Sequence, residues 1–120
     1  MIPSAESILG AHAFLARRFG LTSAPSEAGV RNALAMARAL ATQDTDEPAA
    51  LFFALAMFPR ALGDAWRVLP AVVAINHAVS LGLRLRMTRD ELLPFYGAIV
   101  TRTATFEEVR AWFGKHMDPL

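Results

Sequence analysis

The chain has 120 residues, a formal net charge of +1, 54% hydrophobic and 19% charged residues, and no cysteine. This length predicts one domain over residues 1–120 that buries enough surface to fold without a metal or a disulfide. The lack of cysteine excludes disulfides, thiolate catalysis and cysteine-based zinc sites, and the scattered basic residues form no stripe of the kind that binds nucleic acid.

The apolar segments and the N-terminal residues do not predict a membrane protein. The longest apolar run, residues 48–59, is about half of the ~20 residues that a membrane-spanning helix needs. The first six residues lack the charged start and long apolar stretch of a signal peptide. We therefore expect a cytoplasmic protein that binds neither membranes nor nucleic acid.

The first two predicted helices have apolar residues at helical spacing and polar N-caps. The first spans Ala5–Phe19 and begins after Ser4, and the second spans Glu27–Ala41 and begins after Ser26. His12 lies on the apolar face of the first helix, so we expect it to be a core residue rather than a base or a ligand.

A polar, acidic segment separates the second helix from a strongly apolar one. Residues 42–47 read as a surface loop, in which Asp44, Asp46 and Glu47 are expected to be solvated rather than bound to a cation. The third helix, Pro48–Phe58, is apolar on all sides. A helix of that kind is predicted to lie in the middle of the domain.

The fourth helix follows a predicted loop over residues 59–64 and runs to about Leu81. Its apolar residues cover most of its circumference, which makes it the second central helix. Pro70 would clash with a carbonyl of the preceding turn if the helix began directly after the loop, so we expect a start nearer Leu69. His77, on the same helix, is expected to make a structural hydrogen bond.

The last third of the sequence predicts an extended segment and two capped helices. Residues 83–87 alternate in polarity and are expected to be extended. Thr88 with Glu91, and Thr105 with Glu108, form the spacing of a capping box at the start of a fifth and a sixth helix. The fold class is therefore all-α, with six helices around two buried ones.

The order of these features resembles the death-on-curing (Doc) branch of the Fic fold. Residues 6–20 resemble that family's opening helix, which has a His in its middle and a Phe-Gly pair at its end. Residues 49–58 resemble the buried helix before its active loop, residues 76–85 its turn at a Gly after the central helix, and residues 105–113 its closing helix. The resemblance covers nearly the whole chain and implies a compact domain of the Fic/Doc type.

The loop before the fourth helix corresponds to the family's motif, H-x-F-x-[D/E]-G-N-[K/G]-R. The resemblance implies a His general base, an acidic residue that holds metal or phosphate, a Gly-Asn turn that cradles the anion, and an Arg that neutralises its charge. The corresponding run in this chain supplies seven candidate site residues: Phe58, Arg60, Leu62, Gly63, Asp64, Trp66 and Arg67.

Most motif positions hold residues without the required chemistry. Phe58 stands at the His position and takes no proton, and Leu62 stands at the acidic position and binds no metal. Asp64 stands at the Asn position, where its charge would repel phosphate. We therefore predict no catalytic residue and no metal site, although Gly63 and Arg67 would bind phosphate if the protein were active.

The leading hypothesis is a degenerate Doc-like protein that binds a protein partner, either an antitoxin-like helix or a cellular target, and needs no cofactor. An alternative is an active phosphotransferase or nucleotidyltransferase that uses ATP and Mg, with Arg60 and Arg67 on the phosphates and Asp64 as base or metal ligand. A further alternative is a non-catalytic helical scaffold.

Two features of the loop have structural interpretations as well. Arg60, Asp64 and Arg67 could form a surface salt bridge, which contributes little to stability. Trp66 either anchors a partner or fills the pocket in which a nucleotide would lie, and we expect that it fills the pocket.

Overall fold

A computed structural model describes the backbone of residues 1–120 and all side chains other than that of Arg89. Across this described chain there are seven α-helices: α1 Ala5–Phe19, α2 Glu27–Leu40, α3 Glu47–Ala56, α4 Pro59–Leu62, α5 Leu69–Ser80, α6 Arg89–Val100 and α7 Phe106–Lys115. Two 3₁₀ turns, η1 Asp44–Asp46 and η2 Gly63–Ala65, and two short strands, β1 Leu83–Leu85 and β2 Met117–Pro119, complete it. The all-α class is thus confirmed.

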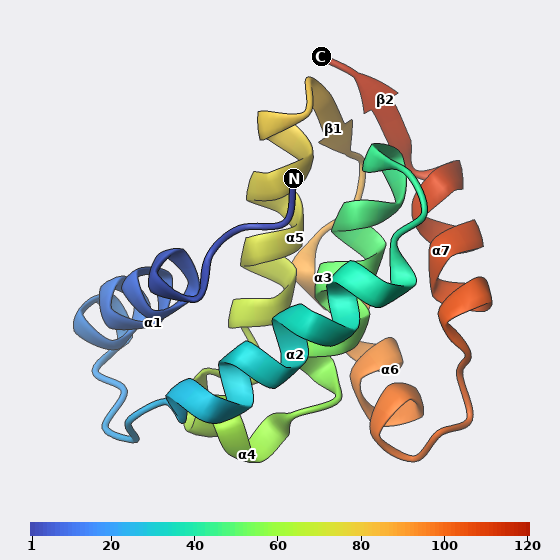
Figure 1. The fold of residues 1–120 in the computed structure, drawn as a ribbon. Helices are drawn as coiled ribbons and strands as arrows, with labels where there is room; N and C mark the ends of the chain where they lie inside the picture. Colours follow the sequence, from blue (N-terminus) through green and yellow to red (C-terminus); the bar gives the residue numbers. More distant parts are fainter.

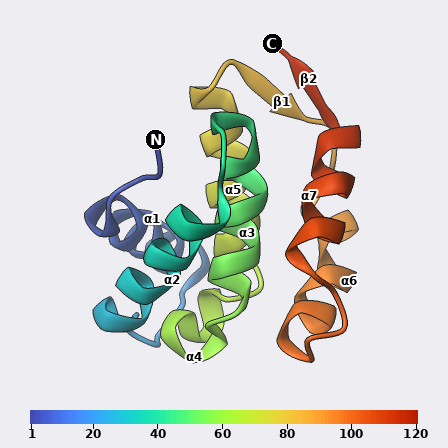
Figure 2. The same ribbon diagram turned by 45° about the vertical axis from the view of Figure 1, so that its right-hand side comes forward.

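α3 lies at the centre of the molecule, as its apolar circumference predicted, and packs mainly on α5, α2 and α7 (Figure 1). Figure 2 shows α1, α2 and α4 on one side of the α3–α5 pair, and α6 and α7 on the other side. A helix with neighbours on both sides buries all of its faces, which explains why α3 has no polar face.

The two sides of α3 belong to two apolar clusters. Leu51 and Leu55 pack in the cluster formed with α1, α2 and the start of α5. Phe52 packs in the cluster formed with α6 and α7, where its ring centroid lies 5.1 Å from that of Tyr96 and 5.6 Å from that of Phe113. Such aromatic contacts stabilise the fold beyond the area that they bury.

The helix boundaries follow the predicted caps closely. Ser4 and Ser26 accept hydrogen bonds from the first turns of α1 and α2, and Gly20 ends α1 in the left-handed conformation with φ +67°. Both capping boxes, at Thr88 and Thr105, are formed in full. These local signals were sufficient because each cap involves residues only three positions apart.

The predicted extended segment forms β1, which pairs with β2 in an antiparallel two-stranded sheet. Arg84 lies opposite Asp118, and the neighbouring Arg86 forms an ion pair with the same Asp118. The strand β2 was not predicted, because the final residues carry no alternating pattern and owe their conformation to the partner strand. The sheet places the C-terminus beside the end of α5 (Figure 1).

The prediction of a loop over residues 59–64 was wrong, which is why the number of helices differs from the predicted six. Pro59 begins the short helix α4, and Gly63 ends it with φ +59°. The turn η2 follows at once. The expected start of the next helix near Leu69 is confirmed, since Pro70 occupies the first turn of α5, where its missing N–H costs nothing.

The prediction that residues 42–47 form a solvated loop was wrong for two of its three acidic residues. Asp46 is 5% exposed and Glu47, which begins α3, is 8% exposed. The Asp46 carboxylate accepts hydrogen bonds from the backbone N–H and the hydroxyl of Thr42. Burial of a charge without partners would be too costly. Both carboxylates can be buried because each has hydrogen-bond partners.

The second central helix, α5, is less enclosed than expected. It is buried against α3 and α1, but Val79 on its outer side is half exposed. Within the described chain, none of the helices has both the length and the apolar character that crossing a bilayer demands.

Candidate functional site

The turn that joins α4 to α5 is fixed to the loop that follows α1. The Asp64 carboxylate accepts hydrogen bonds from the Ser23 hydroxyl and, over 3.2 Å, from the Thr22 backbone N–H. The Asp64 N–H donates back to the Ser23 hydroxyl over 2.9 Å. The hydrogen bond from Ser23, and then that from Thr22, hold the pKa of Asp64 below its ordinary value. Asp64 is therefore an acceptor engaged in structure, which fits poorly with a general base.

The apolar residues of the predicted motif are parts of the core. Leu62 is fully buried, and Phe58 packs against the same cluster. Trp66 contacts both clusters, donates its indole N–H to the Ala56 carbonyl over 3.0 Å, and meets the Tyr96 ring edge-on at 5.0 Å. Trp66 is thus partly buried, with its indole N–H bonded inside the protein.

The two arginines of the predicted site, Arg60 and Arg67, are exposed. The Asp64 carboxylate bonds Ser23 and Thr22 instead. Among the described side chains it forms no ion pair with Arg60 or Arg67, so the surface salt bridge considered from the sequence is not formed. Arg67 lines a hollow together with Trp66 and Leu93.

The second to fourth residues of α5 offer no free backbone amide to an anion. Pro70 has no N–H, the Ala71 N–H donates to the Tyr96 hydroxyl over 3.3 Å, and the Val72 N–H donates to the Val68 carbonyl. In the turn before it, the N–H groups of Trp66 and Val68 donate to the carbonyls of η2. A phosphate at a helix start is normally held by such amides. The residues present here do not fit the phosphates of ATP or a Mg ion bound to them.

A hollow of about 320 Å³ lies between this turn and α6. Its lining consists of Trp66, Arg67, Leu93, Tyr96 and Gly97. On α6, the exposed positions Leu93, Gly97 and Val100 follow the spacing i, i+4, i+7, so they form one apolar face. The chain thus brings an exposed cation and an apolar helix face together.

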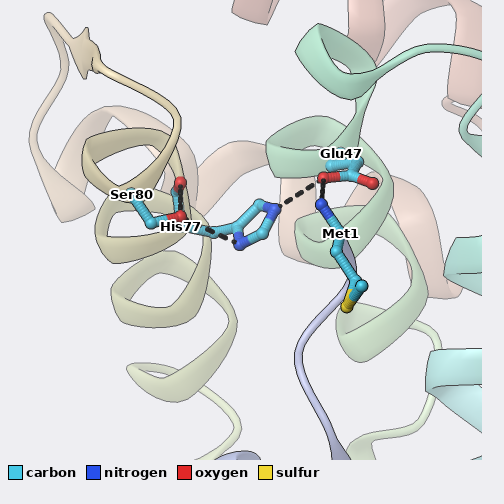
Figure 3. Close-up of polar contacts among 4 residues, drawn as sticks. All are labelled: Met1, Glu47, His77 and Ser80. Atoms are coloured by element: carbon cyan, nitrogen blue, oxygen red, sulfur yellow. Dashed lines mark hydrogen bonds and ion pairs between the residues drawn. The ribbon is translucent and has the colours of Figure 1, made fainter.

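A second polar cluster lies at the opposite end of α5, and sequence reasoning missed it. The Glu47 carboxylate at the start of α3 bonds the His77 Nε2 atom and the Met1 amine, each over 2.8 Å and through the same oxygen atom (Figure 3). Burial alone would raise the pKa of Glu47, but the hydrogen bonds from the amine and from His77 outweigh it and lower that pKa. The hydrogen bond to Glu47 also raises the pKa of the Met1 amine.

The cluster adjoins a cleft between α1 and α5 with a volume of about 370 Å³. Ile8, Ala11, Val72 and Val73 supply apolar walls, and the polar groups come from Met1, Ser7, Asn76, His77 and Ser80. The prediction that His77 makes a structural hydrogen bond is confirmed. Its partner, Glu47, lies 30 positions away in a segment predicted to be solvated, so no local pattern could have identified the pair.

Comparison with protein-family models, with curated proteins and with solved structures finds no match to this chain.

Proposed function

We propose that this protein is a degenerate, non-catalytic relative of the Doc/Fic family that acts by binding a protein partner, in a toxin–antitoxin or phage-defence setting. Support for the family is the order of features along the chain, from the opening helix with His12 to the closing helix with Trp112. Support for a role in binding comes from the loop before α5 and the surface of α6.

The observation that carries the proposal is the closed start of α5. Phosphate transfer requires a proton acceptor and preorganised donors around the anion, and the loss of either costs about 10²- to 10³-fold in rate. Here Pro70 removes one donor and Tyr96 occupies the next, at Ala71. The candidate base, Asp64, is engaged with Ser23. Two amide donors and the candidate proton acceptor are therefore missing or engaged at the same time.

The surface proposed to bind the partner is the apolar face of α6 with the adjoining hollow. Leu93 is 39% exposed and Val100 41% exposed, and the two residues lie about two helical turns apart on the same face. Arg67 stands at the edge of that hollow. A complementary partner is an amphipathic helix that packs apolar residues on α6 and places a carboxylate against Arg67.

Co-expression of this gene with its genomic neighbours tests the proposal. We expect a neighbouring gene product to co-purify with this chain, and we expect Leu93→Glu to abolish co-purification because it places a charge in the apolar contact. Val79→Glu is the matched control, since Val79 is also a half-exposed aliphatic residue but lies on α5. Loss of the partner in both variants, or in neither, would contradict the assignment of this face.

A thermal-shift measurement with ATP and Mg tests the enzymatic alternative. A ligand that binds only the folded state raises the melting temperature by mass action. We expect no shift, because the amides of residues 70–72 are engaged or missing. A shift that Arg67→Ala removes would instead favour an active transferase with an altered loop.

A further inference from the structure

The two nitrogen atoms of the His77 ring have different surroundings. The Nε2 atom lies 2.8 Å from the Glu47 carboxylate (Figure 3). Because an ionised carboxylate accepts hydrogen bonds and donates none, the proton of the neutral ring lies on Nε2, and the Nδ1 atom is left as an acceptor. Among the described groups, the Ser80 hydroxyl, at 3.5 Å, is the one hydrogen-bonding partner within reach of Nδ1.

The Ser80 hydroxyl does not satisfy that acceptor. It has a single hydrogen atom, which it donates to the His77 carbonyl over 2.6 Å. His77 is only 8% exposed, and a polar atom that is removed from water without a partner is costly. The Nδ1 atom therefore favours a donor that comes from outside the chain.

The cleft between α1 and α5 gives such a donor access to the ring. His77 and Ser80 both line this cleft, whereas Glu47 does not. The edge of the ring that carries Nδ1, on the side of Ser80, is therefore the edge that borders the cleft (Figure 3). Its volume of about 370 Å³ lies within the range of ~300–1,000 Å³ that is usual for small-molecule sites.

The lining of the cleft suits a neutral ligand with an apolar body. Apart from residues 1 and 3, the lining belongs to α1 and α5, and its apolar walls are Ile8, Ala11, Val72 and Val73. No Asp, Glu, Lys or Arg is among the described residues that line it, so a charged ligand would meet no counter-ion there. The carbonyl groups at the end of α5 give that end a partial negative charge, which attracts a hydrogen-bond donor.

We propose that this cleft binds a small neutral molecule that has an apolar body and a hydroxyl group, and that the hydroxyl donates a hydrogen bond to His77 Nδ1. The apolar body lies against Ile8, Val72 and Val73, where its burial from water favours binding. A hydroxyl that displaces water from Nδ1 reproduces the hydrogen bond that the water would make, so no affinity is lost in the exchange. The site is independent of the partner surface proposed on α6.

Titration with phenol tests the proposal, with anisole as the match that keeps the ring and the oxygen but has no donor. The ring nitrogen signals of the ¹⁵N-labelled protein are the readout. We expect phenol to shift the His77 Nδ1 signal to saturation and anisole to bind about fivefold or more weakly, as the loss of one hydrogen bond predicts. His116 is the internal reference, because its Nδ1 atom is already bonded to the Trp112 carbonyl.

A matched pair of substitutions on α1 locates the ligand. Ala11→Phe fills the cleft and is expected to abolish phenol binding, whereas Ala13→Phe, on the exposed side of the same helix, is expected to leave it unchanged. Equal affinities for phenol and anisole would overturn the proposal, as would a saturating shift at His12 or His116 in place of His77, or no response to phenol at all. These outcomes are read on the unsubstituted chain, so they stay decisive if Ala11→Phe fails to fold.

Discussion

Gly63 shows how one residue fixes the turn before α5. Its φ of +59° lies in the region that side chains avoid, and an added Cβ atom would overlap the Ser23 hydroxyl and lie 2.9 Å from the Ser23 Cβ atom. We predict that Gly63→Ala lowers the free energy of unfolding by at least about 1–3 kcal/mol, measured by urea denaturation. Ser23 has little freedom to move, because it is bonded to Asp64.

Gly10→Ala is the matched control for that substitution. Gly10 lies inside α1, and an added Cβ atom there would meet nothing within 4 Å. Alanine at this position should raise the free energy of unfolding by about 0.5–1 kcal/mol. If both substitutions changed stability in the same direction, the special role of the Gly63 conformation would be refuted.

His12 is the other residue with a distinct energetic consequence. It is 3% exposed, and its Nε2 atom has no hydrogen-bond partner among the described groups. The expected place in the core is thus confirmed, but the side chain is not fully satisfied. We predict that His12→Leu raises the free energy of unfolding by about 1 kcal/mol, because it removes a buried polar atom without a partner. Thermal and urea denaturation would measure this, and a loss of stability would reveal a polar role for His12.

At the scale of elements, the sequence best predicts features that depend on neighbouring residues, such as helix caps. Residues such as Ser4, Thr88 and Thr105 mark helix starts because a cap needs only its own first turn. The continuous apolar character of α3 identified the central helix, since only a helix with neighbours on both sides has no polar face. These signals need no knowledge of the tertiary structure.

Elements that depend on distant partners were missed. α4 is four residues long, and its Ala61 carbonyl accepts a hydrogen bond from the Ser26 N–H of another segment. β2 exists through its pairing with β1 across the chain. In the candidate site, the resemblance to the family motif pointed to the loop over residues 58–67 but gave no sign that Tyr96 would occupy the Ala71 amide.

The N-cap of α7 allows the contribution of a local pair of hydrogen bonds to the free energy of unfolding to be measured. The Thr105 hydroxyl accepts from the Glu108 N–H over 3.2 Å, and the Glu108 carboxylate accepts from the Thr105 N–H over 3.0 Å. We predict that Thr105→Ala lowers the free energy of unfolding by about 1 kcal/mol, whereas Thr105→Ser, which keeps the hydroxyl, changes it by only a few tenths. Urea denaturation of both variants would check this, and equal losses would assign the effect to the methyl group instead.

At the scale of the whole molecule, Glu47 joins the amino terminus, α3 and α5 in one polar contact (Figure 3). The Cα radius of gyration is 13.0 Å, close to the ~14 Å expected for a compact chain of this length. The exposed Met1 thus pairs with a buried carboxylate that also bonds His77 of α5. Disruption of that pair should affect the stability of the molecule as a unit, because α3 contributes to both apolar clusters.

The pH dependence of stability provides a direct measure of that contact. The pKa of Glu47 is lower in the folded protein than its ordinary value, so the folded state favours the ionised carboxylate more than the unfolded chain does. Its contribution is therefore complete above the unfolded pKa and is lost as the pH falls through the folded pKa. We predict that stability declines in this acidic range and that Glu47→Gln makes the decline shallower, as measured by urea denaturation at a series of pH values.

Glu6→Gln is the reference for an exposed carboxylate whose pKa is also lowered, first by a backbone hydrogen bond and then by one from Arg31. If Glu47→Gln left the acidic slope unchanged while Glu6→Gln reduced it, the surface pair rather than the buried one would control acid stability.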